Sequence, residues 1–512
     1  MVCLGQIDSS FALPKVSNDI VHFQAGKGLG LSVAFGTTLM NYQPRMSLLV
    51  IVIILTSSLV AAAESNATRS VLIRDVPHIE QKPDFCGEAC VAMALQKLGK
   101  PADQDFVFDQ SGLSPIHGRG CYTKDLADAV RNIGFDAGKV WYKVRPASAQ
   151  AELDRLFQVI QTDLTNGHAT VVCMRYDDQP DTTEHFRLIV GYDADRDEII
   201  YQEPATSDRD YQRMSRQMLM KLWPLKYSAE EWTVVMMRLR PTAKLRGSTS
   251  TGFTDADYAQ HIHELKKRLP GDDFHVVLEK PFVVVGNDPA ETVQQHSTNT
   301  VQWAVNRLKK DYFTKDPVHI VDIWLFRDKD SYEENCVRLF GTKPTTPFGY
   351  YSSSDQALVM NISTGGGTLV HEIVHPFIEA NFPDCPSWFN EGLASMYEQC
   401  RDNSGHIWGS TNWRLNGLKE AIADQRVPAF KTLCSTTRHE FYEEDPGTNY
   451  AQARYLCYYL QEQGLLVKYY HEFRENVASD PTGYKTLQNV LGTDDMDEFK
   501  QRWEAYAAAL RF

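Results

Sequence analysis

The sequence lacks internal repeats, low-complexity tracts and long runs of lysine or arginine. No segment recurs with a period of roughly 20 to 50 residues, which excludes a solenoid or a propeller. The formal net charge is -14 and the pI about 5.6, so no concentrated basic surface is available to neutralise phosphates. We therefore exclude nucleic acid as a partner, and the acidic balance indicates solubility instead.

The composition excludes a disordered or fibrous chain. Of the 512 residues, 43% are hydrophobic, 23% charged and 11% aromatic, as in globular proteins. A chain of this length exceeds what one hydrophobic core usually supports. We therefore expect two domains of ordinary size.

Long apolar runs are scarce as well. The one strongly apolar stretch, Leu48 to Val60, is short for a membrane span, and three alanines, Ala61 to Ala63, follow it. An apolar segment followed by small residues is typical of a signal peptide, so we expect cleavage near Ala63 and a secreted or periplasmic protein.

The start of this signal peptide is open to two interpretations. Arg45 supplies its positive end if translation begins upstream, at Met40, which would make residues 1–39 an over-extended start. Residues 1–63 are then leader and signal peptide. In the alternative, the segment stays uncleaved and anchors the protein, and only then is a membrane a partner.

The ten cysteines are interpreted through this export. An oxidising compartment permits disulfides, and removal of Cys3 with the leader leaves an odd number of nine. At least one thiol must then stay unpaired, and Cys86 is the candidate. The sequence leaves open which of the other eight pair.

The remaining chain divides into two α+β domains joined by a linker. Residues 64–240 alternate between helical and strand patterns, with helices expected at 86–98, 124–133 and 149–165 and strands at 169–175, 185–193 and 198–202. Residues 241–254 are rich in Gly, Ser and Thr and form the predicted linker.

Residues 255–512 form the second predicted domain. Its first half is predicted to hold helices at 258–269 and 300–312 and strands at 274–278, 281–285 and 319–326, with an edge strand at 357–362. After Gly365, Gly366 and Gly367 the pattern is helical nearly to the end. A sheet followed by helices is an α+β arrangement.

A metal-binding pattern follows the glycines. Thr368 is expected to cap a helix that carries His371, Glu372 and His375. Histidines at i and i+4 share one helical face and converge on one ion, while the intervening glutamate reaches the position where water binds. This pattern predicts a catalytic zinc site with Glu372 as the general base, which passes the water proton to the leaving amine.

The third protein ligand that zinc requires is expected to be Glu391. It lies sixteen residues after His375, on a helix that Pro386 and Ser387 can start. The alternative for these residues is a helix with an exposed histidine pair and a structural glutamate.

The segment from Thr368 to Glu398 resembles the gluzincin metallopeptidases of the aminopeptidase-like superfamily, in which HExxH precedes a Trp-x-x-Glu-Gly helix. The resemblance implies a zincin-like fold with His371, His375 and Glu391 as zinc ligands. It also implies that the edge strand pairs with extended substrate. Such enzymes usually carry an oxyanion-stabilising tyrosine; we assign this role to Tyr450, whose alternative is core packing beside the other tyrosines of its helix.

A second pattern lies in the first domain, around Cys86. This cysteine begins an apolar helix, whose positive end favours a thiolate, and Gln81 upstream can donate to an oxyanion. His185 opens one strand and Glu203 ends the next, so antiparallel pairing brings imidazole and carboxylate side by side. The set predicts a nucleophilic cysteine with its base and orienting acid.

Residues 65–239 resemble the papain-like cysteine peptidases of the bacteriocin-leader-processing family. The chain departs from the family pattern at two places: Glu203-Pro204 replaces the usual Asp-Pro, and Gln81 is one residue closer to Cys86. A longer carboxylate can still bond to the imidazole. The alternative is a structural disulfide from Cys86 to Cys90 or Cys121, or a domain retained for binding.

Together these patterns predict an exported zinc peptidase fused to a cysteine peptidase domain, acting on peptides or proteins. The substrate sequence, and endo- or exopeptidase action, stay open. The alternative is a cell-surface or periplasmic binding or scaffold protein whose two peptidase domains are degenerate.

Overall fold

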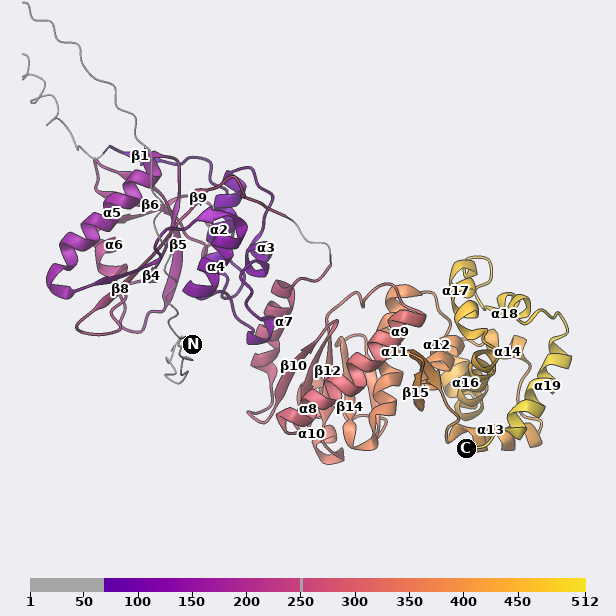
Figure 1. The fold of residues 1–512 in the computed structure, drawn as a ribbon. Helices are drawn as coiled ribbons and strands as arrows, with labels where there is room; N and C mark the ends of the chain where they lie inside the picture. The colour runs from indigo at the N-terminus through magenta and orange to yellow at the C-terminus, as the bar shows by residue number, and fades with distance from the viewer. Residues whose placement is uncertain (1–68, 249–251) are drawn as a thin grey trace, which may run out of the picture. The chain divides into compact units, whose positions relative to one another are not determined.

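A computed structural model describes residues 69–248 and 252–512 (Figure 1). The predicted signal segment and its cleavage site lie outside the described residues. Contacts divide the chain into two units. The first unit comprises the described residues up to Glu80 with Ala89–Lys100 and Gly134–Arg246; the second comprises Gln81–Glu88, Pro101–Ile133 and the described residues from Gly247 on. No helix in the described ranges has both the length and the apolarity to span a membrane.

The first unit is built on an antiparallel sheet. Its order is β3-β8-β4-β5-β6-β7, and β1 also pairs with β5. The strands are β1 (Val71–Leu72), β3 (Trp141–Val144), β4 (Thr170–Arg175), β5 (Glu184–Asp193), β6 (Glu198–Gln202), β7 (Gln212–Ser215) and β8 (Trp232–Arg238). A separate pair joins β2 (Phe135–Asp136) to β9 (Arg240–Pro241).

Helix α5 (Ala149–Thr165) covers one face of this sheet. Its apolar side chains Leu156, Phe157 and Ile160 pack with Val172 and Met236 of the strands in one buried cluster. Spacings of three and four residues place those helical side chains on one face, as the sequence pattern predicted. The unit also contains α6 (Arg216–Leu222) and most of α2 (Cys86–Lys97).

The second unit contains a five-stranded sheet of order β10-β11-β12-β14-β13. Strands β11 (Phe282–Gly286), β12 (Val321–Phe326) and β14 (Ala357–Asn361) run parallel, whereas β10 (His275–Glu279) and β13 (Gly349–Ser352) are antiparallel to their neighbours. The strand predicted at 357–362 is present as β14, but its predicted place at the sheet edge is wrong. That segment is interior, because the short strand β13 pairs with it and takes the edge.

Both faces of this sheet are covered, which explains its nearly continuous apolar strands. In β12, Ile323 and Leu325 face one core and Trp324 and Phe326 the other, since side chains alternate along a strand. One face packs against α7 (Asp255–Arg268) and α10 (Lys329–Phe340). The other face packs against α9 (Trp303–Asp311) and α11 (Gly366–Asn381). Helix α8 (Ala290–His296) precedes α9 in the chain.

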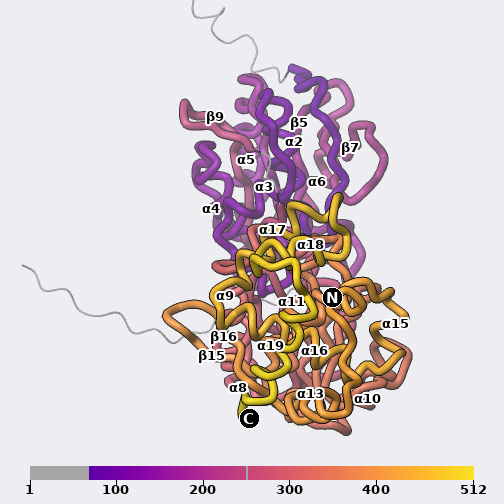
Figure 2. Tube along the Cα trace, turned by 90° about the vertical axis from the view of Figure 1, so that its right-hand side faces the viewer, coloured from indigo at the N-terminus to yellow at the C-terminus, as the bar shows by residue number. Residues whose placement is uncertain are grey.

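After α11 the second unit is helical apart from a hairpin of β15 (Cys400–Asn403) and β16 (His406–Gly409). Helix α16 is at the centre of this helical part, in contact with α12, α13, α15, α17 and α19 (Figure 2). They are α12 (Ser387–Met396), α13 (Arg414–Ala423), α14 (Phe430–Cys434), α15 (Arg438–Glu443), α16 (Pro446–Glu462), α17 (Leu466–Asn476), α18 (Tyr484–Leu491) and α19 (Met496–Ala509). Three helical segments that precede the first unit's strands β2 to β9 in the chain also belong to this unit. They are α3 (Gln104–Asp109), η1 (Pro115–His117) and α4 (Thr123–Ile133).

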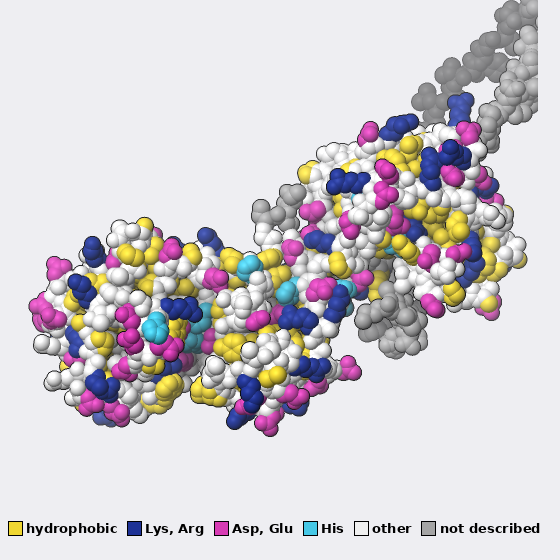
Figure 3. Space-filling view, turned by 180° about the vertical axis from the view of Figure 1, so that it is seen from behind, with side chains coloured by type: hydrophobic (Ala, Val, Ile, Leu, Met, Phe, Trp, Pro, Cys, Tyr) yellow, Lys and Arg dark blue, Asp and Glu magenta, His cyan; other side chains and the backbone are white. Residues whose placement is uncertain are grey.

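The described surface carries no basic patch on the face drawn in Figure 3. Lysine and arginine side chains are interspersed there with aspartate and glutamate.

The glycines before α11 bring two helices together. The N-cap of α11 is Gly365 at φ +104°, so the predicted capping role of Thr368 is wrong; Thr368 lies inside the first turn. A Cβ on Gly367 would lie 2.1 Å from the carbonyl oxygen of Glu398, just after α12. Only glycine permits this approach of the two helices that carry the predicted zinc ligands.

Substitution of Gly367 by alanine is expected to destabilise the protein. The added methyl group forces α11 and the end of α12 apart, at about 1–3 kcal/mol. Gly417→Ala is the matched control, because it adds a methyl group within helix α13 where no atom lies within 4 Å. Urea unfolding should show a lower midpoint for the first variant and an equal or higher one for the second; equal losses would contradict the close approach.

Candidate functional site

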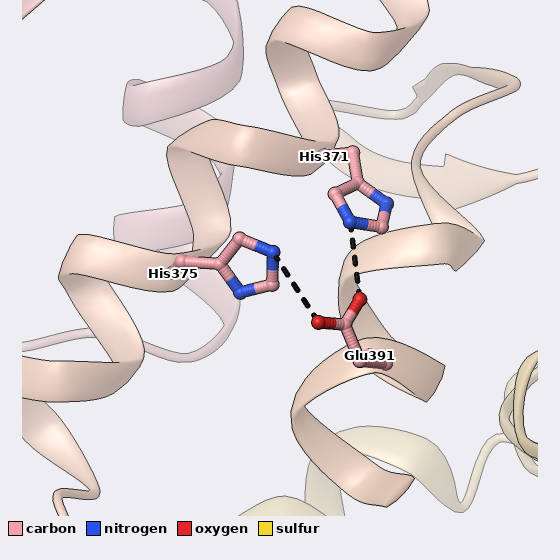
Figure 4. A group of neighbouring side chains, drawn as sticks. All are labelled: His371, His375 and Glu391. Carbon is pink, nitrogen blue, oxygen red and sulfur yellow. Dashed lines mark ion pairs between the residues drawn. The ribbon is translucent and has the colours of Figure 1, made fainter. Parts of the chain in front are cut away.

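The three predicted zinc ligands converge in the second unit (Figure 4). His371 and His375 project from α11 and Glu391 from α12, and their nearest ligand atoms all lie within 4.8 Å of one another. Nε2 of His371 is 3.2 Å from Oε2 of Glu391, and Nε2 of His375 is 3.9 Å from Oε1. Each imidazole thus directs its own Nε2 toward the carboxylate of Glu391.

The chemistry of this group fits a divalent cation. His371 and Glu391 are 7% and 6% exposed, and Oε2 of Glu391 is buried without a hydrogen-bond partner. Burial would raise the pKa of Glu391, but His375, His371 and a hydrogen bond from Tyr442 outweigh it and lower the pKa to about 2. A buried, ionised carboxylate beside two imidazoles is a donor set that zinc accepts.

The other imidazole nitrogens contact a second layer of side chains. Nδ1 of His375 lies 3.0 Å from Oδ1 of Asn390, and Nδ1 of His371 lies 3.4 Å from Oε1 of Glu398. Glu398 in turn accepts two bonds from Arg414, of 2.8 and 3.1 Å, and one of 2.7 Å from Asn412. Such partners fix the ring orientation and direct Nε2 toward the shared position.

Glu372 lies beside the three predicted zinc ligands. Its Oε2 is 3.7 Å from Nε2 of His375, and its side chain is 11% exposed. Burial raises the pKa of Glu372, although the two histidines and the nearby backbone of Tyr351 on β13 oppose that shift. A carboxyl with a raised pKa is suited to accept and return a proton.

Two tyrosines approach Glu391, and the sequence pointed to only one. Burial and the charge of Glu391 raise the pKa of Tyr450, whose ring centroid lies 6.1 Å from that of Tyr442. The hydroxyl of Tyr442 donates to Oε1 of Glu391 at 2.6 Å. Sequence reasoning missed Tyr442 because it lies 51 residues beyond Glu391, in no recognisable motif. It also missed Glu398, although a spacing of seven residues, two helical turns, could have indicated a shared face with Glu391.

The predicted cysteine site falls on both units, so its parts are described separately. In the first unit, Nε2 of His185 and Oε1 of Glu203 are 2.5 Å apart, and both side chains are buried. Their predicted pairing across β5 and β6 is therefore confirmed. Burial would raise the pKa of Glu203, but the hydrogen bond with His185 and the charges of His185 and Arg187 outweigh it and lower the pKa.

In the second unit, Cys86 begins α2 as predicted, and Oε1 of Gln81 is buried without a hydrogen-bond partner. None of the nine cysteines in the described ranges forms a disulfide. The predicted alternative of a bridge from Cys86 to Cys90 or Cys121 is thus absent from the structure. Cys121 is buried, and its backbone N–H donates to Oε1 of Glu88 at 2.7 Å.

Comparison with known proteins bears on the N-terminal part. The model of the Peptidase_C39 like family matches residues 73–229. These residues form a cysteine peptidase-like domain. Among solved structures, the chain is similar to xylellain, a cysteine protease from Xylella fastidiosa, at 10% identity over 35% of this chain and 90% of that chain, with a TM-score of 0.24. No curated protein matches the chain.

The papain-like part of the predicted fold class is thus supported, and the structure is a mixed α/β protein with a mainly helical C-terminal part. The family match ends before the second unit's sheet. The resemblance to gluzincins therefore stays a prediction, as do the roles of the individual site residues.

Proposed function

We propose that this chain is an exported peptidase with two catalytic centres, a zinc centre in the second unit and a cysteine centre in the N-terminal domain. The observation that carries the zinc centre is the convergence of His371, His375 and Glu391 within 4.8 Å, with Glu372 beside them. Export rests on the apolar segment at 48–60 and the alanines after it.

In the zinc centre, His371, His375 and Glu391 would hold the ion. A bound Zn²⁺ would polarise the peptide carbonyl and lower the pKa of a water ligand to about 7. Glu372 accepts the proton of the attacking water on its carboxylate and passes it to the leaving nitrogen. Tyr450 stabilises the oxyanion through its hydroxyl, because the hydroxyl of Tyr442 already donates to Glu391.

The zincin-like fold belongs to this proposal. A mixed sheet, the helix α11 against it and the return of Glu391 from α12 support it. The antiparallel edge strand β13 carries Tyr351, whose backbone is near enough to Glu372 to oppose the rise of its pKa, so this edge lies beside the proposed base. We propose that extended substrate pairs along β13 rather than along β14.

In the cysteine centre, the thiolate of Cys86 adds to the peptide carbonyl and the amine leaves with a proton from His185. Water then hydrolyses the thioester and regenerates the thiol. Glu203 orients the imidazole, and Gln81 donates to the oxyanion. The match of residues 73–229 to the cysteine peptidase family and the contact between His185 and Glu203 support this centre.

Removal of the metal tests the zinc centre. With a chelator, hydrolysis of a mixture of proteome-derived peptides should lose the cleavages made by this centre, and added Zn²⁺ should restore them. Cleavages of the cysteine centre should persist in the chelator and disappear with iodoacetamide. A cleavage profile that a chelator leaves unchanged would reject the zinc centre.

The two tyrosines have separable expected effects. Tyr442→Phe removes a hydrogen bond to the ligand Glu391, so zinc affinity should fall by about tenfold or more. Tyr450→Phe should leave zinc affinity unchanged and lower kcat by about 10²-fold or more if its hydroxyl stabilises the oxyanion. Zinc titration against a competing chelator, beside peptide kinetics, separates them; the reverse pattern would exchange the two roles.

A further inference from the structure

A buried arginine in the first unit belongs to no predicted motif. Arg187 is 4% exposed and lies on β5, two residues after His185. Residues i and i+2 of a strand point to the same face of the sheet, so Arg187 and His185 face the end of β6 together. A buried arginine requires partners for its charge and its donors, and here one of them is Glu203.

The guanidinium of Arg187 is held on every side. Nε donates to Oε2 of Glu203 at 2.7 Å, and Nη2 donates to the carbonyl of Tyr176 at 2.8 Å. Nη1 donates to the carbonyl of Arg175 at 3.3 Å. The carbon Cζ lies 5.2 Å and 5.4 Å from the ring centroids of Tyr176 and Tyr201. The planar fork is thus fixed by hydrogen bonds and by two aromatic faces.

The two oxygens of Glu203 are divided between different partners. Oε2 binds Arg187, while Oε1 binds Nε2 of His185 and accepts the backbone N–H of Ala205 at 3.1 Å. The ring of Tyr176 also lies edge-on to His185, with centroids 5.1 Å apart. One arginine therefore sets both the direction of the carboxylate and the position of the ring beside the imidazole.

We propose that Arg187 is a positioning residue of the cysteine centre, which holds Glu203 ionised with Oε1 toward His185, so that the imidazolium–thiolate form persists into acid. The proposal rests on the proposed function of Cys86. Without the arginine, the buried carboxyl of Glu203 would take a proton at higher pH and would no longer stabilise the imidazolium. The lowered pKa of Glu203 agrees with this role.

Among the described residues, His185 and Arg187 are the charged groups that act on the carboxylate of Glu203. His185 and Arg187 face it from β5, and Tyr201 lies on β6. Tyr176, directly after β4, reaches Arg187. His78 contacts the side chain of Gln202 and the carbonyl of Thr206, which are neighbours of Glu203 in the chain.

The test is the pH profile of Cys86 alkylation by iodoacetamide in the full chain, with the Cys86 peptide quantified by mass spectrometry. An ordinary thiol, with a pKa of about 8.5, reacts about a thousandfold more slowly at pH 5 than at pH 8. The parent should instead keep most of its reactivity at pH 5. Arg187→Met should lower the rate at pH 5 by about tenfold or more and change the rate at pH 8 by less than about threefold.

Two further variants keep the result decisive. Arg213→Met removes an exposed arginine of β7 that pairs with Asp193 and Glu198, and it should leave the profile unchanged. Arg187→Lys keeps the charge but cannot reproduce the planar fork, so its alkylation rate at pH 5 should fall between those of the parent and Arg187→Met. If Arg187→Met does not fold, the rate of Arg187→Lys at pH 5 tests the role of Arg187.

The outcomes separate the two claims. A parent with an ordinary thiol profile would reject the cysteine centre, and with it the role of Arg187. A parent reactive in acid, with Arg187 variants that share its ratio of rates at pH 5 and pH 8, would keep the cysteine centre and overturn the role of Arg187.

Discussion

Glu372→Gln is expected to slow metal-dependent peptide hydrolysis by at least about 10²- to 10⁴-fold, the contribution of a general base. The amide has nearly the shape of the carboxylate but accepts no proton from the attacking water. Because Glu372 is not one of the three ligands, zinc affinity should remain close to that of the parent. Chelator-sensitive cleavages and zinc affinity are measured on the same preparation.

Glu379→Gln is the matched control for this variant. Glu379 lies on the same helix α11 and pairs with the hydroxyl of Tyr351 at 3.0 Å, but it is exposed and not part of the converging group. Its activity should stay within a few fold of the parent. If Glu372→Gln cleaved as fast as Glu379→Gln, the proposed metal-assisted mechanism would be wrong.

Cys86→Ala is expected to abolish the cleavages that persist in a chelator, by about 10⁴-fold or to below detection, since no other group can form the thioester. Metal-dependent cleavages should continue at the parent rate. The measurement is the peptide cleavage profile with and without chelator, for parent and variant.

Cys90→Ala provides the comparison. Cys90 lies one turn further along α2 and is buried, with Sγ 3.7 Å from the carbonyl oxygen of Phe186. Its loss changes packing within the same helix and leaves the proposed nucleophile in place. Equal loss of chelator-resistant cleavage in both variants would indicate a structural role for α2 rather than a nucleophile at Cys86.

The sequence predicted those parts of the fold that depend on local periodicity. Helices α4 and α5 lie within one residue of the predicted ranges, because their apolar residues recur with helical spacing over three turns or more. The edge of the second sheet was mispredicted. Strand β13 has four residues, Gly-Tyr-Tyr-Ser, with little alternation, and only its pairing with β14 defines it.

The same division holds for the site. His371, Glu372 and His375 share one helix, so their spacing alone fixes their common face. Pairing of His185 with Glu203 followed from two adjacent strands and a short turn. Tyr442 and Arg187, in contrast, act through tertiary contacts: one reaches Glu391 from a different helix, and the other is a charged residue inside an apolar strand. A buried arginine in such a strand is a signal that could have been noticed.

The zinc content of the purified full chain tests the central claim most directly. After dialysis against metal-free buffer, elemental analysis should find about one zinc per chain in the parent and almost none in Glu391→Ala, which loses a ligand and leaves two imidazoles. Glu379→Gln should retain the parent value. A parent without zinc, or equal zinc in parent and Glu391→Ala, would contradict the assignment of His371, His375 and Glu391 as a zinc site.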